Sequence, residues 1–399
     1  MLLCRDEEWE PQFNLNNLSA ERQLYYIRLS LEVALRGVSQ VYLCDDVLIG
    51  AVILIAISLF SSELFLHCVL GVVSALFTAT IIVRLPQDVI MSGRLSCDGS
   101  QVGCFVWAVL DVTSDSSAVT SVFGRGRLLA VTAVLSALAS VVHLPCASLL
   151  SACRLPSHTA ASNCVVFITL CVVARGSING LSLVYPGTLN MEESANISAL
   201  SFFCHTTLRG IGQIVRVNST IGGGIILLGV LARGYWRVGL CLVLGSGMAC
   251  VVATGWLQLP FHEMITVFSA FYGSNGACVC AALGSGRFYQ SSVLVFSSSL
   301  TTAFLLLVGL TAAVLTVLVE DRLHETILLV RILHGEGVIS EDGDTTGGRL
   351  NDDPSTYVLP SLTIPHLMCF WATSVTVLAA AGFNARPAEF RIVTHHISV

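Results

Sequence analysis

Long apolar runs alternate with shorter polar breaks along most of this chain. Leu64–Leu85, Leu128–Leu150 and Val238–Leu259 are predominantly apolar, and each reaches the length of about 20 residues with which a helix crosses the hydrocarbon core of a bilayer. Leu24–Cys44 differs because three charged side chains interrupt it, so we expect it to face protein or a polar cavity rather than lipid. The pattern predicts an all-α integral membrane protein.

Two segments are too short and too polar to cross a membrane alone. Pro86–Cys97 and Pro260–Ser274 each begin with proline and carry an acid in the first turn, Asp88 or Glu263. Both features are typical of a helix N-terminus. We predict re-entrant half-helices that end near the middle of the membrane, where their last carbonyl groups lack intrahelical partners.

Two further segments mark boundaries of the apolar runs. Thr113–Arg127 is rich in serine, glycine and charge, and we expect it to be a hydrophilic break between helices. Cys164–Val184 is apolar over its length, and we expect it to form one spanning helix.

Five landmarks recur in the same order in the two halves of the chain. Leu35–Gln40 reads Leu-Arg-Gly-Val-Ser-Gln and Leu208–Gln213 reads Leu-Arg-Gly-Ile-Gly-Gln, and ten residues after each glutamine comes a glycine. A Leu-Pro pair, a triplet ending in glycine and a Leu-Pro-Ser-x-Thr segment follow in both halves: Leu85–Pro86 and Leu259–Pro260, Cys97–Gly99 and Ser274–Gly276, Leu155–Thr159 and Leu359–Thr363. We interpret this as an internal duplication. An odd number of crossings per half would make the repeats inverted, but segment lengths alone leave that number open.

Polar segments divide the chain into membrane repeats and tails. The loop Tyr185–Ser198 contains a glycosylation sequon at Asn196, so we expect it to lie outside, with both tails in the cytoplasm. The predicted parts are a polar N-terminal tail (1–23), a first membrane repeat (24–195), a second membrane repeat (196–384) with an inserted acidic loop (320–357), and a C-terminal tail (385–399).

Composition supports a bilayer location and excludes several functions. Hydrophobic residues make up 54% of the chain and charged residues 12%, against about 25% charged residues in soluble domains. The net charge of −6 is diffuse, so nothing indicates a nucleic-acid partner. The fifteen cysteines lie mostly in apolar runs, where cysteine behaves as a small hydrophobe, and no metal-ligand or nucleophile–base pattern appears. We therefore expect no metal, no cofactor and no enzymatic activity.

Side chains that recur in both halves are the candidates for a solute site. Gln40 and Gln213 offer amide donors and acceptors, and Thr159 and Thr363 offer hydroxyl groups. With the half-helix carbonyls they would suit a small neutral solute that carries several N–H donors. The alternative is that they form hydrogen bonds between helices, which is the more frequent role of such residues in membranes.

Other recurring polar residues favour structural roles. Arg36 and Arg209 are expected to anchor half-helix carbonyls or an acid rather than to touch solute. Asp98 and Asn275, each followed by glycine, are typical of a cap or a turn, and we weigh that interpretation equally with a place on the pore wall.

At these residues the chain resembles the urea transporter family of channels. Arg209–Val215 reads Arg-Gly-Ile-Gly-Gln-Ile-Val, where the family shows Arg-Gly-Ile-Gly-Gln-Val. Phe271–Gly276 is similar to the family's Gly-Leu-Tyr-Gly-Phe-Asn-Gly turn, and Leu155–Thr159 and Leu359–Pro365 resemble its Leu-Pro-Val-Phe-Thr-Leu-Pro-Phe segment. The likeness covers roughly residues 24–384.

The resemblance implies about ten transmembrane helices plus two re-entrant half-helices in two inverted repeats. It also implies a homotrimer with a pore inside each subunit, through which urea passes down its gradient. The family's paired glutamines map onto Gln40 and Gln213, and its mid-pore threonines map onto Thr159 and Thr363. We expect the protein to lie in the lipid bilayer of the plasma membrane.

The chain departs from the family where aromatic side chains flank the urea sites. Leu43 and Arg216 stand three residues after the two glutamines, and Cys97 and Ser274 occupy the turn positions of another aromatic. These four residues join the two glutamines and two threonines as candidate substrate-binding residues. The altered positions leave two alternatives open: a channel for another small amide or ammonia-like solute, and a non-conducting membrane scaffold.

Overall fold

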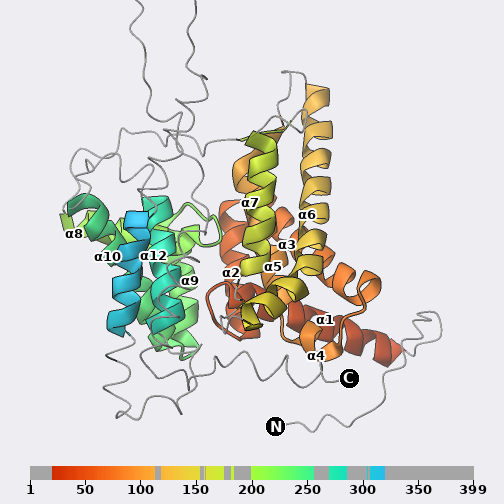
Figure 1. Cartoon of the computed structure of the whole chain (residues 1–399), viewed down its shortest axis with the longest axis horizontal. Helices are drawn as coiled ribbons and strands as arrows, with labels where there is room; N and C mark the ends of the chain where they lie inside the picture. Colours follow the sequence, from red (N-terminus) through yellow and green to blue (C-terminus); the bar gives the residue numbers. More distant parts are fainter. Residues whose placement is uncertain are drawn as a thin grey trace, which may run out of the picture.

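The structure, a computed structural model, is built almost entirely of helices (Figure 1). It describes residues 20–112, 118–152, 157, 159–174, 181–183, 199–255, 269–284, 303 and 306–319. The first-half helices are α1 (Ala20–Gln40), α2 (Val47–Phe60), α3 (Ser62–Phe77) with its π-helical extension η2 (Thr78–Ile82), α4 (Gln87–Met91), α5 (Arg94–Val109), α6 (Ala118–Ala152) and α7 (Ala160–Ala174). The second-half helices are α8 (Ala199–Gln213), α9 (Thr220–Ala232), α10 (Trp236–Gly255) and α12 (Ser269–Gly284), and Leu306–Val319 is also helical.

Three helical stretches of the described residues are long and apolar enough to cross a membrane: Ser62–Ile82, Arg125–Ala152 and Trp236–Gly255. They correspond to the expected spans Leu64–Leu85, Leu128–Leu150 and Val238–Leu259, and the prediction of a helical membrane protein is confirmed. α2 and α9 are apolar but shorter. The acidic loop 320–357, Asn196 and Thr363 lie outside the described residues.

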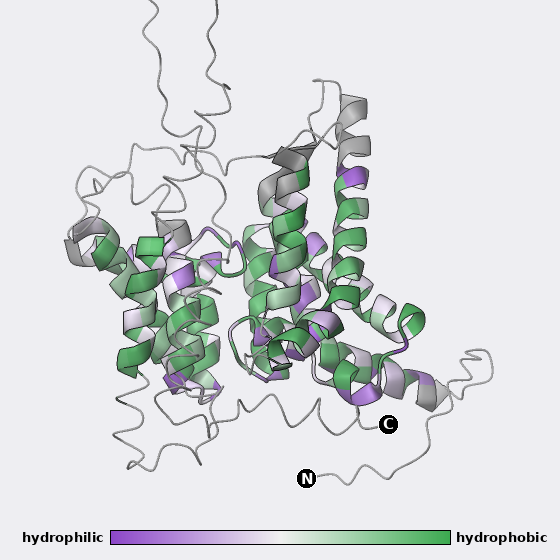
Figure 2. Ribbon diagram, viewed as in Figure 1, coloured by the Kyte–Doolittle hydropathy of each residue, from purple (hydrophilic) through white to green (hydrophobic). Residues whose placement is uncertain are grey.

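Hydrophobic residues predominate in the described helices (Figure 2), and many large apolar side chains are exposed. Leu149 and Leu228 are each 67% exposed, whereas Ser136, Asp98 and His143 are buried. In water-soluble proteins serine and aspartate are mostly exposed. The arrangement suits a molecule whose surroundings are hydrocarbon, where ionisable side chains face the interior and bind one another.

Helices of the two halves meet mainly through α2 and α9; Figure 1 shows the first half on the right and the second on the left. Tyr42, just after α1, donates its hydroxyl hydrogen to the carbonyl oxygen of Ile211 in α8 at 2.8 Å. Arg233, at the end of α9, binds the Asp46 carboxylate with an Nη2–Oδ2 distance of 2.8 Å. Polar bonds at the helix ends and apolar packing between them therefore hold the halves together.

The recurring landmarks make matching contacts in the two halves. Gly50 of α2 lies so close to α1 that an added Cβ would overlap the Leu35 carbonyl, and Gly223 of α9 lies equally close to Leu208 of α8. The glycine after each repeated motif is thus the residue that lets two helix backbones touch.

A second pair of close crossings occurs between the longer helices. Gly71 of α3 contacts the backbone of Gly99 in α5, and Gly245 of α10 contacts the backbone of Gly276 in α12. Close approach of this kind is how membrane helices gain van der Waals packing where lipid offers no hydrophobic driving force.

The expectation that Asp98 and Asn275 sit in turns is wrong. Both lie inside helices, α5 and α12 respectively. The glycines that follow them serve the helix crossings described above rather than a change of chain direction. Sequence alone does not separate these two uses of glycine, because both depend on the missing side chain.

The first half-helix is shorter than predicted. α4 ends at Met91, and Gly93, with φ of +78°, reverses the chain before α5 begins at Arg94. Glycine adopts this left-handed conformation without steric cost and commonly terminates helices. The residues of the second expected half-helix before Ser269 lie outside the described part of the chain.

Two further boundaries are corrected. α6 begins at Ala118 instead of after Arg127, because Ala118–Phe123 is helix-compatible and the two glycines that follow are tolerated in a long helix. The expected helix Cys164–Val184 ends at Ala174, and the strand β2 (Leu181–Leu183) then pairs antiparallel with β1 (Leu110–Val112).

Candidate functional site

Each repeated glutamine ends a helix and opens a tight turn. The Leu43 amide donates to the Gln40 carbonyl at 2.8 Å, and the Arg216 amide donates to the Gln213 carbonyl at 3.0 Å. Leu43 has φ of +58° and Arg216 of +63°, a left-handed conformation that is unusual for residues other than glycine. Such strain persists only where the surrounding structure enforces it, and it is concentrated at functional sites. The two positions that depart from the family's pattern thus share one backbone shape.

Side chains of α1 bind the C-terminal end of the half-helix α4. Gln40 donates its amide hydrogen to the Ser92 carbonyl oxygen at 2.5 Å. Arg36 donates to the Met91 carbonyl at 3.4 Å and forms an ion pair with Asp45 at 3.2 Å. Carbonyls that an isolated half-helix would leave bare therefore have protein partners. Gln40 makes the helix-to-helix bond that was the alternative to solute binding.

The second-half arginine has an equivalent place. Arg209 donates from Nε to the side-chain oxygen of Asn218, and the pair matches Arg36 and Asp45 in position relative to the repeated glutamine. Both arginines therefore tie the end of a helix to the turn that follows it. Their expected role as structural anchors agrees with these contacts.

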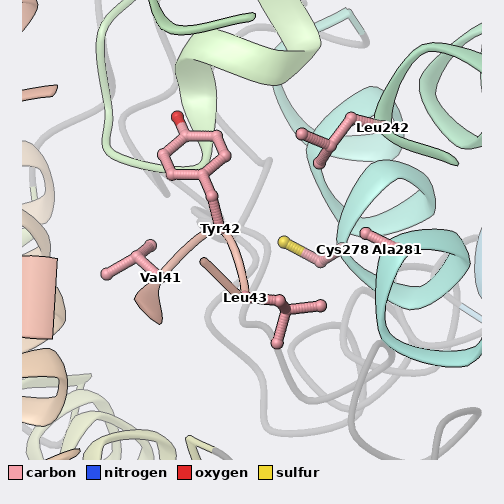
Figure 3. Close-up of a pocket in the computed structure, with 6 residues that line it drawn as sticks. All are labelled: Val41, Tyr42, Leu43, Leu242, Cys278 and Ala281. Carbon is pink, nitrogen blue, oxygen red and sulfur yellow. The ribbon is translucent and has the colours of Figure 1, made fainter. Parts of the chain in front are cut away.

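The first-half turn packs against the second-half helix α12 (Figure 3). Leu43 and its neighbours face Cys278, whose sulfur points towards the turn. We call the narrow space between them the apolar cavity. It is lined by Val41, Tyr42, Leu43, Leu242, Cys278 and Ala281. The cavity has no room for a water molecule. Leu43 therefore closes, rather than opens, the space where the family's pattern places an aromatic.

The second-half turn packs against the first-half helix α5 in the reciprocal way. The space between them is a polar cavity of about 40 Å³, lined by Gln101, Cys104, Phe105, Ser162, Asn163, Val166, Ile214 and Arg216. Arg216 stands where Leu43 stands in the other turn, and Gln101 lies three residues after Asp98 just as Cys278 lies three after Asn275. Each turn thus meets the other half's helix at matching positions, and one cavity is apolar while the other is polar.

Hydrogen bonds organise the wall of the polar cavity at the start of α7. The Ser162 hydroxyl lies 2.9 Å from both the Gln101 side-chain oxygen and the Thr159 carbonyl oxygen. Asn163 donates its amide to the Thr159 hydroxyl oxygen at 3.0 Å and to the Thr159 carbonyl at 2.7 Å. Thr159 is itself buried and stands behind this wall, in contact with two of its residues.

A buried acid–imidazole pair lies directly behind the same wall. Asp98 and His143 are 1% and 4% exposed, and the distance from Asp98 Oδ2 to His143 Nδ1 is 2.7 Å. The other carboxylate oxygen of Asp98 accepts a hydrogen bond from the Ser162 backbone amide at 3.3 Å. The pair and the cavity wall are therefore joined through one residue.

The structure brings together only part of the expected site. Arg216 lines the polar cavity and Thr159 binds two residues of its wall, Leu43 lies at the apolar cavity, and Gln40 is bound to the half-helix. Gln213, Cys97 and Ser274 are buried, the last two within α5 and α12; Thr363 is not among the described residues.

Sequence reasoning missed Gln101, Ser162, Asn163 and His143. For His143 a signal existed, because an ionisable residue inside an otherwise apolar span is a functional candidate by itself. The other three carry no repeated pattern, and only packing of α5 against α7 brings them to one wall.

A comparison with known families decides which family this chain belongs to. The family model described as "Urea transporter" matches residues 31–326, which is most of the chain. The chain belongs to the urea transporter family. Members are membrane proteins that transport urea, and the helical, apolar fold agrees with this. A search of curated proteins finds no match.

Proposed function

We propose that this urea transporter is a passive channel whose solute path runs inside each subunit, between its two halves. The observation that carries the proposal is the reciprocal packing of each glutamine-following turn against the other half's helix. This arrangement places two related cavities at the contact between halves, as expected of a duplicated pore.

The polar cavity has the chemistry that a small amide needs. Gln101 supplies an N–H donor for a carbonyl oxygen, and Asn163 and Ser162 supply oxygen acceptors for N–H groups. Among the described residues no carboxylate lines this cavity, so a cation gains little from them, whereas a neutral amide exchanges its water shell for side-chain partners. Urea is the solute we propose, because it combines one carbonyl oxygen with two amino groups.

The apolar cavity is the closed point of the proposed path. Passage of any solute there requires the side chains of Leu43 and Cys278 to move apart, because no water-sized space separates the lining residues. The same observation favours a second candidate function, a membrane scaffold that does not conduct. The two candidates differ in one measurable property, the flux of solute.

Stopped-flow light scattering on proteoliposomes that contain the purified protein tests the proposal. We expect urea influx that exceeds influx into protein-free liposomes and that falls strongly in Ser162→Phe, which fills the polar cavity. Gly224→Ala is the matched control, because its added Cβ would meet open space on α9. Flux equal to that of protein-free liposomes establishes the scaffold. A panel of acetamide, formamide and ammonia distinguishes urea from other small amides and ammonia-like solutes.

We further propose two inverted repeats with about ten transmembrane helices and two half-helices, assembled as a homotrimer in the plasma membrane. The matching close contacts at Gly50 and Gly223 support the duplication, and the resemblance of the motifs to the family supports the topology and assembly. Epitope tags on both tails, combined with glycosidase treatment at Asn196, test the topology. Tags and glycan on the same side of the membrane contradict it, and native mass measurement tests the trimer.

A further inference from the structure

The buried pair of Asp98 and His143 places an ionisable group where the other half of the chain carries an amide. Asn275 stands at the corresponding position of the second half, where an amide meets the same need for a polar group without a charge. The carboxylate of Asp98 instead lies 2.7 Å from an imidazole, with both side chains almost fully buried. An ionisable group inside a membrane protein is costly, so its retention points to a use.

Protonation decides the charge of this pair. With one shared proton the pair is an imidazolium–carboxylate or its neutral equivalent, and the net charge is zero. Without that proton a carboxylate remains buried beside a neutral imidazole. The second state is costly in low-dielectric surroundings, because a buried carboxylate without a counter-charge needs further hydrogen-bond donors to stabilise it.

Ser162, which lines the polar cavity, also binds Asp98. Ser162 already gives its backbone N–H to Asp98 Oδ1, and its hydroxyl is directed at Gln101 and Thr159. Turning that hydroxyl to the carboxylate removes its bond to Gln101, a cavity-lining amide. Loss of one proton behind the wall therefore changes the groups that a solute meets in front of it.

Ionisable side chains also lie on α5 and on the helices that pack against α5 and α6. They include Arg94, Cys97 and Cys104 on α5, His67, Cys68 and Glu63 on α3, Arg125, Arg127 and Cys146 on α6, Cys164 on α7, Arg36 on α1 and Asp88 on α4. Among the described residues no other carboxylate is bonded to His143, and Cys97 and Cys146 interact electrostatically with Asp98.

We propose that Asp98 and His143 are positioning residues that set the wall of the polar cavity through Ser162 and so make urea flux depend on pH. Flux is high while the pair holds its proton and falls as pH rises and the proton is lost. This inference rests on the proposed function only in placing the polar cavity on the solute path. The change at Ser162 follows from the pair itself.

Three variants of the full-length protein separate the states of the pair. Asp98→Asn keeps an oxygen acceptor for Ser162 but cannot become charged, so its flux is expected to stay at the wild-type acid level at every pH. His143→Gln leaves the carboxylate without a basic partner, so its flux is expected to match the wild-type alkaline level at every pH. The double variant pairs two amides and is expected to behave as Asp98→Asn does.

The measurement is urea flux into proteoliposomes, normalised to folded protein, between about pH 5.5 and about pH 8. For wild type we expect urea flux at the alkaline end of this range to be lower than at the acid end by about fivefold or more. Fivefold is the smallest effect expected from the loss of one hydrogen bond in a buried site. His67→Gln is the matched control: His67 is also buried but contacts the Thr132 hydroxyl at 2.6 Å, away from the lining of the polar cavity. This variant is expected to keep the wild-type pH profile.

Hydrogen exchange of the Ser162 amide gives a second readout that does not depend on transport. After correction for the intrinsic pH effect, we expect exchange in Asp98→Asn to match acid wild type and exchange in His143→Gln to match alkaline wild type. Absence of urea flux at every pH refutes the proposed function, while the exchange pattern still decides the positioning role. A wild-type flux that does not vary with pH, or exchange that is the same in wild type and both variants, overturns the inference.

Discussion

Gly223→Ala tests whether the close contact between α8 and α9 positions the functional turn. A Cβ at this residue would overlap the Leu208 carbonyl oxygen and would lie 2.7 Å from the Leu208 carbonyl carbon and 3.0 Å from the Gly212 amide nitrogen. All three atoms belong to backbone, so no side-chain rotation relieves the overlap. The two helices must separate, and the turn that carries Arg216 follows the end of α8.

The magnitude follows from the packing. Overpacking of a close-packed interior costs about 1–3 kcal/mol, and contact with backbone places this substitution near the upper end. A loss of about 3 kcal/mol lowers the ratio of folded to unfolded protein by about 150-fold. Gly224→Ala, on the adjacent position of the same helix, meets nothing within 4 Å, so we expect a gain of about 0.5–1 kcal/mol from better helix propensity.

Thermal unfolding in detergent, followed by size-exclusion chromatography, measures both variants against wild type. We expect a melting temperature several degrees lower for Gly223→Ala, with urea flux per folded molecule also reduced, and none of these losses for Gly224→Ala. Gly50→Ala is expected to repeat the result in the first half, since its Cβ would overlap the Leu35 carbonyl. Equal melting temperatures for the Gly223 and Gly224 variants would refute the reasoning.

Three further substitutions test individual contacts. Arg216→Phe restores an aromatic wall and removes a charge from the polar cavity, so urea flux should rise severalfold; unchanged flux at equal expression contradicts a place on the path. Thr159→Val deletes an acceptor of Asn163. A buried donor left without a partner costs about 1–3 kcal/mol, so we expect urea flux to be about 5- to 150-fold lower. Unaltered flux would show that Thr159 is not part of the site. Burial raises the pKa of Asp46, but hydrogen bonds from Arg233 and the start of α2 outweigh it and lower the pKa overall; its stabilisation is therefore present above about pH 4 and lost as pH falls further. Asp46→Asn should accordingly be slightly less stable than wild type at neutral pH, and the difference in melting temperature should vanish in acid. A difference that persists there would contradict the ion pair.

The sequence by itself determined the class of the protein. Long apolar runs place the chain in a membrane. Backbone N–H and C=O groups that cross hydrocarbon must be paired within the protein, and a helix pairs them along its own length. The repeated Leu-Arg-Gly-x-x-Gln motif indicated a duplication, and the structure places both copies at the ends of corresponding helices, at Gln40 and Gln213. The glycine ten residues later was also a reliable landmark, because nothing larger fits the contacts of Gly50 and Gly223.

The side chains that line the two cavities could be identified only from the tertiary structure. Gln40 reads like a pore residue but bonds to Ser92 of the half-helix, whereas Gln101 and Ser162 carry no motif yet line the polar cavity. The pairing of Asp98 with His143 joins residues 45 positions apart in sequence. Hydrogen bonds of this kind depend on how α5, α6 and α7 pack, and the packing angle between helices is a property of the whole interface that no short segment encodes.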